Sequence, residues 1–283
     1  MSMVRDRAPT RITAAATATF AVVGLGLIAA LLLGAWPLIG EPRPLANLLG
    51  GLWDPLRGAY GLAPFFVGTV VVTATAMALT LPFSLAVAVV LSRPLPDGVR
   101  LGATRVLTVL TAVPSVIFGW WGLLAVVPWV RARFGGAGFS LLAAGLVLAI
   151  MVTPTLSLLF YQALRSVPRA FRDGSAALGA TPDQTLVRME LPCALPLLIQ
   201  AVLIAVARAV GETMAVQMVI GGQTVLPTGL TSPGATLTTQ ILTDMSIFPP
   251  GTRGHAVLDV MALVLMVGMY LLVRLAERWV AMP

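Results

Sequence analysis

The 283-residue chain is 58% hydrophobic and only 10% charged, and its mean hydropathy is +0.95. An average soluble domain is about 25% charged and about 45–50% apolar, so a soluble core of this composition would lack the polar surface needed to cover it. A soluble enzyme, a disordered chain and a nucleic-acid-binding domain are therefore excluded. The composition is that of an integral membrane protein.

All 18 basic residues are arginine, and the formal net charge is +7. Without lysine the chain has neither a P-loop lysine nor a Schiff-base lysine, so it cannot use a standard ATP-binding motif of its own. One histidine, His255, and one cysteine, Cys193, cannot build a zinc site of the usual ligand sets. We expect no metal and no cofactor, and the energy for any transport must come from an ion gradient or from another chain.

Long apolar runs predict six membrane-spanning helices, because about 20 apolar residues are needed to cross roughly 30 Å of hydrocarbon. The predicted spans are residues 12–36, 65–91, 106–129, 139–161, 194–220 and 256–273. The first run is longer than the roughly 7–15 apolar residues of a signal peptide, so it is interpreted as a retained helix. Pro82, Pro114 and Pro154 interrupt the second, third and fourth runs and are expected to kink them.

The distribution of arginine predicts the orientation of these spans. Six spans place both termini on one side of the membrane, with twelve arginines on that side and five on the other. Arginine-rich loops stay in the cytoplasm, although Arg131 and Arg133 go against the trend. We therefore expect a multi-pass protein of the bacterial plasma membrane with both termini in the cytoplasm.

A hydrophilic segment, residues 165–192, follows the fourth predicted span and is cytoplasmic in this arrangement. Asp173 followed by small residues is typical of a helix start, and Gly179 is typical of a helix stop. A second short helix is expected to begin at Pro182 and to end before Pro192. On composition alone, the segment is an amphipathic loop on the membrane surface.

The spacing within this segment resembles the cytoplasmic signature of ABC-importer permeases, E-A-A-x(3)-G-x(9)-I-x-L-P. The residues at the signature positions are Asp173, Gly174, Ser175, Gly179, Met189, Leu191 and Pro192. The distance from the glycine to L-P agrees in full, whereas the opening triplet departs in all three residues, conservatively. The resemblance implies that these residues form a coupling helix that docks in a groove of an ATPase subunit, where small residues let two backbones approach closely.

Further motifs resemble the phosphate permeases of this family, those of the PstC type. They are residues 64–69 (PFFVGT), 112–119 (AVPSVIFG), 177–181 (ALGAT) and 208–216 (RAVGETMAV), the last being close to R-A-x-G-E-T-M-A-V. The resemblance covers residues 60–220 and keeps the same order along the chain. It implies an all-α integral membrane protein with six transmembrane helices and the type I ABC-importer permease (MetI-like) fold.

The resemblance also implies a division of the chain and a function. Residues 1–64 would hold a cytoplasmic tail, the first helix and an external loop, and residues 65–283 a five-helix permease core with the coupling segment 165–192. The chain would move inorganic phosphate into the cytoplasm by alternating access. Its expected partners are two PstB-like ATP-binding subunits, a second, PstA-like permease, an external PstS-like phosphate-binding protein and membrane lipid. With ATP hydrolysis in another chain, this subunit is not itself an enzyme.

Other functions remain open at this point. Within the class, the alternative substrate is another oxyanion such as sulfate, molybdate or a phosphonate. A proton-coupled secondary transporter would need more intramembrane carboxylates than Glu212, and it would have no reason to keep the coupling-segment spacing. An embedded hydrolase would need a nucleophile with a base or a metal cluster, which one histidine does not supply.

Two charged residues, Arg208 and Glu212, fall inside the fifth predicted span. They are four residues apart and hence expected on one helix face. A charge at the bilayer centre costs roughly 2.5–3.5 kcal/mol, so both should face protein or water. They would form either a mutually neutralising pair or a pathway site, in which Arg208 offers a planar donor fork to an anion and Glu212 acts as a clamp or gate. Thr213 and Ser115 complete the candidate translocation pathway.

Overall fold

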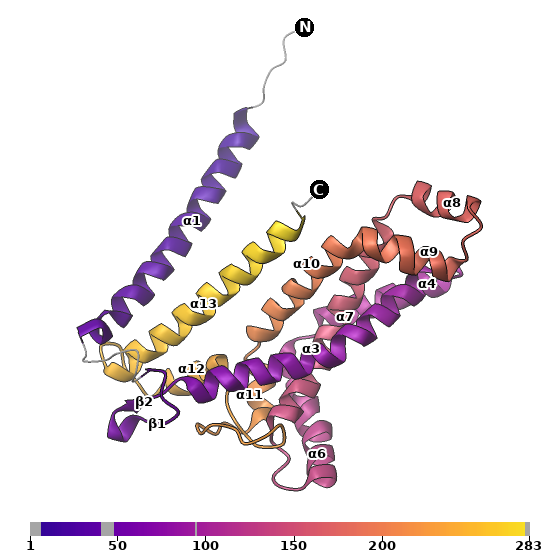
Figure 1. The fold of residues 1–283 in the computed structure, drawn as a ribbon. Coiled ribbons are helices and arrows are strands. Elements are labelled where there is room, and N and C mark those ends of the chain that lie inside the picture. The colour runs from indigo at the N-terminus through magenta and orange to yellow at the C-terminus, as the bar shows by residue number, and fades with distance from the viewer. Residues whose placement is uncertain (1–6, 41–47, 94, 281–283) are drawn as a thin grey trace.

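The computed structural model describes residues 7–40, 48–93 and 95–280, most of which are helical (Figure 1). The α-helices are α1 (Arg7–Ala35), α3 (Ala63–Ser92), α4 (Asp97–Ala112), α5 (Ser115–Trp121), α6 (Val127–Phe134), α7 (Leu141–Arg165), α8 (Arg169–Ala177), α9 (Pro182–Thr185), α10 (Leu191–Val210), α11 (Met214–Ile220), α12 (Leu237–Asp244) and α13 (Arg253–Val280). The shorter elements are the 3₁₀ helices η1 (Trp36–Gly40) and η2 (Pro55–Arg57), the π-helical turns η3 (Gly122–Val126) and η4 (Leu186–Glu190), and the strands β1 (Trp53–Asp54) and β2 (Ala59–Tyr60).

Six helical stretches of the described chain are long and apolar enough to cross a membrane, which confirms the predicted number. These stretches are Thr13–Leu38, Ala63–Ser92, Ser115–Phe134, Leu141–Arg165, Pro182–Val210 and Arg253–Arg278. The N-terminal end of α1 and the C-terminal end of α13 lie on the side of the molecule that also carries α8 (Figure 1). We call this side the α8 end, and the side that carries β1, β2 and α6 the opposite end.

The third span begins later than the sequence predicts. Residues 106–112 belong to α4, a separate helix without a buried residue, and the span starts at Ser115. Pro114 causes the break, because a proline disfavours helical backbone in the residue before it, and Val113 is indeed extended with a ψ of 127°. Pro82 and Pro154, in contrast, lie inside the continuous helices α3 and α7.

The fifth span begins earlier and ends earlier than the predicted residues 194–220. It runs from Pro182 to Val210, through α9, η4 and α10, and α11 follows as a separate short helix. The prediction that a helix ends before Pro192 is wrong. In the π-helical turn the N–H of Leu191 bonds to the carbonyl of Leu186, five residues back, so the helix passes Pro192, which has no N–H to donate.

The centre of the bundle is the pair α3 and α7, which pack side by side (Figure 1). The hydroxyl of Thr80 donates to the carbonyl of Ala149 at 3.3 Å, and the hydroxyl of Ser84 donates to the carbonyl of Thr153 at 3.2 Å. Interhelical hydrogen bonds of this kind hold membrane helices together where apolar burial cannot. These polar residues of the second span therefore serve packing, and α10, α11 and α4 pack against α7 around them.

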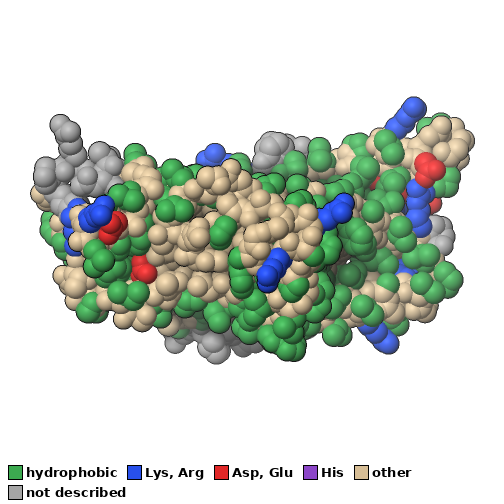
Figure 2. Space-filling view, turned by 90° about the horizontal axis from the view of Figure 1, so that it is seen from below, with side chains coloured by type: hydrophobic (Ala, Val, Ile, Leu, Met, Phe, Trp, Pro, Cys, Tyr) green, Lys and Arg blue, Asp and Glu red, His purple; other side chains and the backbone are tan. Residues whose placement is uncertain are grey.

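A second apolar cluster lies at the opposite end. Trp53 and Tyr60 face each other across the antiparallel strands β1 and β2, with ring centroids 5.5 Å apart, and Phe65 of α3 packs on Trp53 at 5.1 Å. Leu237 of α12 and Met261 of α13 belong to the same buried cluster. Viewed from this end, charged side chains are few and are separated by hydrophobic and uncharged ones (Figure 2).

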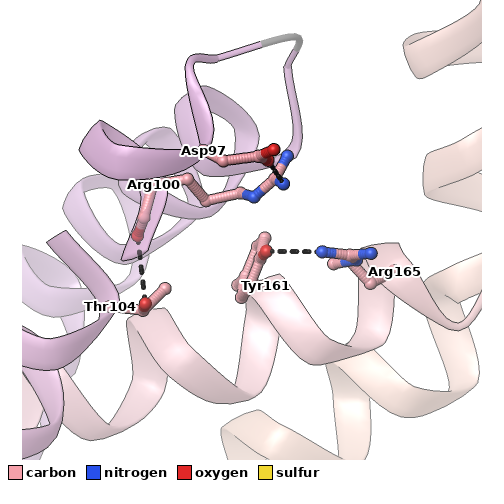
Figure 3. Close-up of polar contacts among 5 residues, drawn as sticks. All are labelled: Asp97, Arg100, Thr104, Tyr161 and Arg165. Carbon is pink, nitrogen blue, oxygen red and sulfur yellow. Dashed lines mark hydrogen bonds and ion pairs between the residues drawn. The ribbon is translucent and has the colours of Figure 1, made fainter. Parts of the chain in front are cut away.

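Near the α8 end, α4 lies along α7, and two arginines there are engaged locally (Figure 3). Arg100 pairs with Asp97 and accepts a hydrogen bond from the Thr104 hydroxyl at its backbone carbonyl. Arg165 donates to the hydroxyl of Tyr161 at 3.0 Å. Each guanidinium group is thereby held by a residue of its own helix.

The first helix contributes little to the buried core. Only 6% of the most apolar 18-residue stretch of this helix is buried inside the protein. The helix packs mainly on α13. Gly34 permits this contact, because a Cβ at this position would overlap the carboxylate of Asp259. The large exposed apolar surface of α1 suits a lipid environment.

Candidate permeation and coupling sites

The polypeptide leaves helical geometry between α10 and α11. α10 ends just before Gly211, and Glu212 and Thr213 precede α11, so the prediction that Arg208 and Glu212 share one helix face is wrong. Glycine is a poor helix former. In addition, the Glu212 carboxylate accepts the N–H of Ala215 at 3.1 Å, which offers the backbone an alternative to helical bonding.

This break is held in place by α12. The hydroxyl of Thr238 donates to the backbone carbonyl of Glu212 at 3.1 Å, and the side-chain amide of Gln217 donates to the hydroxyl of Thr243 at 3.3 Å. Non-helical backbone at membrane depth is tolerated only where protein or an aqueous cavity surrounds it. The break between α10 and α11 is therefore a specific, supported feature of the fold.

Arg208 lies in the last turn of α10 with an exposed side chain. Among the residues that the structure describes, none forms an ion pair or a hydrogen bond with its guanidinium group. A mutually neutralising pair with Glu212 is thus absent from the described chain. A free arginine on a membrane helix must meet water or another protein, and it carries five N–H donors in a planar fork.

The other two predicted pathway residues lie at neighbouring helix breaks. Thr213 precedes α11, and its hydroxyl approaches the carbonyl of Gly211 at 3.4 Å. Ser115 begins α5, directly after the break at Pro114. The short helices α5 and α11 pack closely, since a Cβ at Gly119 would clash with Ala215. The structure therefore packs the two short helices that follow these breaks against each other.

One polar feature was missed by sequence reasoning. A cavity of about 290 Å³ between α7 and α10 is lined by Gln162, Ser166 and Gln200 together with apolar residues, and by no charged residue. Gln200, Ile204 and Arg208 follow one another at four-residue steps along one ridge of α10. At a rise of 1.5 Å per residue, Gln200 lies about 12 Å along the helix from Arg208, toward the α8 end. In the sequence, this feature could have been suspected only from the two glutamines inside otherwise apolar helices.

A buried carboxyl group on α12 was also missed. Asp244 is 5% exposed, and the side-chain amide of Gln240 donates to it at 2.7 Å. Burial raises the pKa of Asp244 above its ordinary value of 3.8, and hydrogen bonds from Gln240 and Trp53 oppose this shift. No motif marks the residue, so its burial could be learned only from the fold.

The coupling motif forms two helices joined at Gly179, as its spacing predicts. Gly179 has a φ of +79°, a left-handed conformation that glycine adopts without strain, and no atom lies near the position that a Cβ would take. α8 begins at Arg169, so Asp173 lies in its middle and the predicted helix start is wrong. Pro168, just before the helix, supplies the start signal instead.

The motif residues differ in exposure, and all lie at the α8 end. Asp173, Gly174, Gly179 and Pro192 are exposed, Met189 and Leu191 are half-buried, and Ser175 is buried. No group of three or more histidine, cysteine, aspartate or glutamate side chains that could hold a metal ion occurs in residues 7–40, 48–93 and 95–280.

Six apolar spans, a broken helix with a free arginine, and a two-helix motif at one end define a class, that of membrane-embedded transporter subunits. Residues 81–281 match the family described as "Binding-protein-dependent transport system inner membrane component". The chain belongs to this family and is a multi-pass inner-membrane permease of an ABC importer.

Similar proteins of known name show which members of the family the chain resembles. The chain is 36% identical over 241 residues to the probable ABC transporter permease protein YqgH of Bacillus subtilis, covering 84% of this chain and 78% of that protein. It is 30% identical over 254 residues to the phosphate transport system permease protein PstC of Haemophilus influenzae, covering 81% and 80%. These relatives are membrane permeases, and the chain is PstC-like.

Solved structures show the same fold. An inward-facing MetNI methionine ABC transporter matches with a TM-score of 0.58 at 21% identity, covering 84% of this chain and 97% of that chain. A bacterial alginate ABC transporter, in complex with an alginate-bound periplasmic protein, matches with a TM-score of 0.68 at 12% identity, covering 98% and 96%. The expected all-α fold of a type I ABC-importer permease is confirmed.

Proposed function

We propose that this chain is the PstC-like permease subunit of an ATP-driven importer that moves inorganic phosphate into the cytoplasm by alternating access. The observation that carries the proposal is Arg208, an arginine without an ion-pair partner in the described chain, placed one turn before a break in a membrane helix. In many secondary transporters the substrate binds at broken helices near the middle of the bilayer. The likeness to permeases named as parts of phosphate transport systems supports phosphate as the substrate.

Glu212 would contribute selectivity. Its carboxylate accepts one N–H from Ala215 and is half-buried at the break, about one helical turn from Arg208 in sequence. Phosphate carries a proton near neutral pH and can donate it in a hydrogen bond to a carboxylate, whereas sulfate and molybdate carry none and are repelled. An arginine and a carboxylate that both reach the anion at this break would therefore favour phosphate among tetrahedral oxyanions.

Beyond the break, the cavity between α7 and α10 would take the anion onward. Its carboxamides, on Gln162 and Gln200, are neutral donors, and no carboxylate lines the cavity. Conduction requires binding strong enough for the anion to be taken up and weak enough for its release. Neutral donors after a charged one meet that requirement.

The other subunits of the transporter complex would be separate chains. We propose two PstB-like ATPase subunits docked on Asp173, Gly174, Ser175, Gly179, Met189, Leu191 and Pro192, a PstA-like second permease, and an external PstS-like binding protein. The α8 end would then face the cytoplasm, together with both termini. ATP hydrolysis would take place in the ATPase subunits.

Uptake of radiolabelled phosphate tests the substrate. Cells in which the gene is deleted should lose high-affinity phosphate uptake, and a plasmid copy should restore it. Unlabelled sulfate and molybdate should compete poorly, whereas unlabelled phosphate competes fully. Uptake that is unaffected by the deletion, or that is abolished by sulfate, would overturn the phosphate assignment.

A further inference from the structure

The position of α8 depends on polar contacts. Ser175 is the one buried residue of this nine-residue helix, so apolar packing fixes it weakly. Its neighbours are α9 and η4, and the Ser175 hydroxyl meets the hydroxyl of Thr185 at 2.9 Å. A displacement of α8 reaches the membrane helices through the short linkers to α7 and α9 and through side-chain contacts, which fix its direction.

Arg172 makes two polar contacts in two directions, one an ion pair without hydrogen-bond geometry and the other a hydrogen bond. Its Nε forms an ion pair with a carboxylate oxygen of Glu190 at 3.0 Å, and its Nη2 donates to the backbone carbonyl of Leu164 at 2.8 Å. The two charged side chains are 29% and 13% exposed, which shields the pair from solvent screening. One guanidinium group thus connects α8 to the C-terminal end of α7 and to η4.

These two attachment points belong to the two helices that enclose the polar cavity. Leu164 lies two residues after Gln162 on α7. Glu190 lies on the continuous helix from Pro182 to Val210, about 27 Å along the helix from Arg208 at 1.5 Å per residue. The backbone is helical from Glu190 to Val210, so a shift at Glu190 has a continuous helical path toward the break.

We propose that Arg172 is a positioning residue that transmits displacement of α8 to α7 and α10, and so links events at the ATPase to the permeation pathway. The proposal rests on the proposed function, since it takes α8 to be the part of the chain that the ATPase moves. Arg93 and Asp183 also join α3 to α9, but Asp183 is 84% exposed, and surface pairs contribute little. The partly buried bridge is the stronger link.

The test uses the complete complex in proteoliposomes: both permeases, the ATPase and the binding protein. For Arg172→Gln and Glu190→Gln we expect unchanged amounts of assembled complex and unchanged basal ATP hydrolysis. Stimulation of hydrolysis by the loaded binding protein, and uptake, should each fall about fivefold or more, the lower end of measured coupling factors. Arg172→Lys should not restore stimulation, because an ammonium group cannot reach both partners as the planar fork does.

A matched control is Arg274→Gln. Arg274 also pairs with a glutamate, Glu277 at 3.1 Å, but on the exposed surface of α13, and its loss should change neither readout. A second arm bridges Arg172→Cys and Glu190→Cys, in a Cys193→Ser background, with a short bifunctional thiol reagent. If the role is positional, the bridge restores stimulation although both charges are gone.

Normal stimulation in both neutral variants would overturn the proposal, as would losses that only follow the amount of assembled complex. If Arg172→Gln fails to assemble, the proposal is tested with Glu190→Gln and with the bridged double cysteine variant. The measurements are again stimulated ATP hydrolysis and uptake. Failure of the proposed substrate is distinguishable. A wild-type complex that ignores phosphate but responds to another oxyanion overturns phosphate, and the Arg172 test is then made with that anion.

Discussion

The helix break and the coupling segment use arginine in opposite ways. At the break, Arg208 has no ion-pair partner among the described residues, and Glu212 is bonded to backbone. In the coupling segment, Arg172 holds both Glu190 and the carbonyl of Leu164. One arginine is left available, and the other contacts two partners within the chain.

This difference fits the roles that we propose for the two regions. A group that binds a transient anion must keep its donors free between cycles, because a permanent carboxylate partner would compete with the anion. A segment that transmits displacement must stay in contact with the helices that it moves, because a segment without such contacts could shift without moving them. Variants that remove the free donor, the ion pair of Arg172 or the proposed docking surface test this difference.

The largest effect is expected at the docking surface. Gly179→Trp should stop ATP-driven uptake, because the bulky side chain keeps the ATPase groove from approaching. Within the chain there is open space at this position, so the cost there is that of a left-handed backbone, roughly 1–2 kcal/mol. Uptake and co-purification of the ATPase subunit are the measurements.

Gly179→Asn is the control for the backbone, since asparagine tolerates left-handed geometry better than other residues with a side chain. It should assemble and transport at a rate close to that of the wild type. Undiminished uptake by Gly179→Trp would show instead that the segment is a passive surface helix.

The next largest effect is expected at the free arginine. Arg208→Gln strands no carboxylate, so the variant should fold and assemble. Uptake should fall roughly 10- to 100-fold, the loss expected for a hydrogen bond to a charged group worth about 1.5–3 kcal/mol. Arg208→Lys should recover only part of it, because an ammonium lacks the planar two-pronged geometry.

The double variant Arg208→Gln with Glu212→Gln separates the two readings of these residues. If they formed a neutralising pair, removing both charges would restore uptake. The structure shows no such pair in the described chain, and we expect uptake to stay low. Normal transport by a well-expressed double variant is the contradicting result.

Sequence patterns predicted the spans well, because a run of apolar residues has few alternatives to crossing the bilayer. The coupling glycine was also predictable, since a fixed spacing reflects local turn geometry. Some errors had local causes, such as Pro114 and the π-helical turn before Pro192, whereas the error at Arg208 and Glu212 involved another part of the chain. Arg208 and Glu212 at a four-residue interval indicate one helix, and only the bonds from Thr238 and to Ala215 show otherwise.

Other features could be recognised only from the way in which the helices pack against one another. Gln162 and Gln200 lie on different helices, and nothing in the sequence shows that α7 and α10 bring them to one cavity. Arg172 and Glu190 are likewise separated by a turn and a π-helical segment. The sequence contains these residues without marking them, because each acts through a tertiary contact.

A smaller effect on uptake is expected at the cavity. Gln200→Leu removes one neutral donor and should lower uptake roughly two- to tenfold, since such a hydrogen bond is worth about 0.5–1.5 kcal/mol. Gln200→Glu, of nearly the same size, places a negative charge there and should lower uptake further. Equal uptake by Gln200→Glu and wild type, at equal amounts of protein, would mean that the anion takes another route.

The smallest effect concerns stability. Asp244 is a buried carboxyl group bonded by Gln240 and Trp53 rather than by an arginine, so it tests whether burial without a cation lowers stability. Its pKa is raised in the fold, so its contribution to stability is full below the ordinary value of 3.8 and is lost as pH rises through the folded-state pKa. Asp244→Asn keeps the hydrogen-bonding oxygen but cannot ionise. Thermal unfolding of the purified chain should therefore show little difference from wild type near pH 4 and a relative gain for the variant near pH 7. A variant that is less stable than wild type near pH 7 would show that the ionised carboxylate is favoured in the fold, against the direction of the shift.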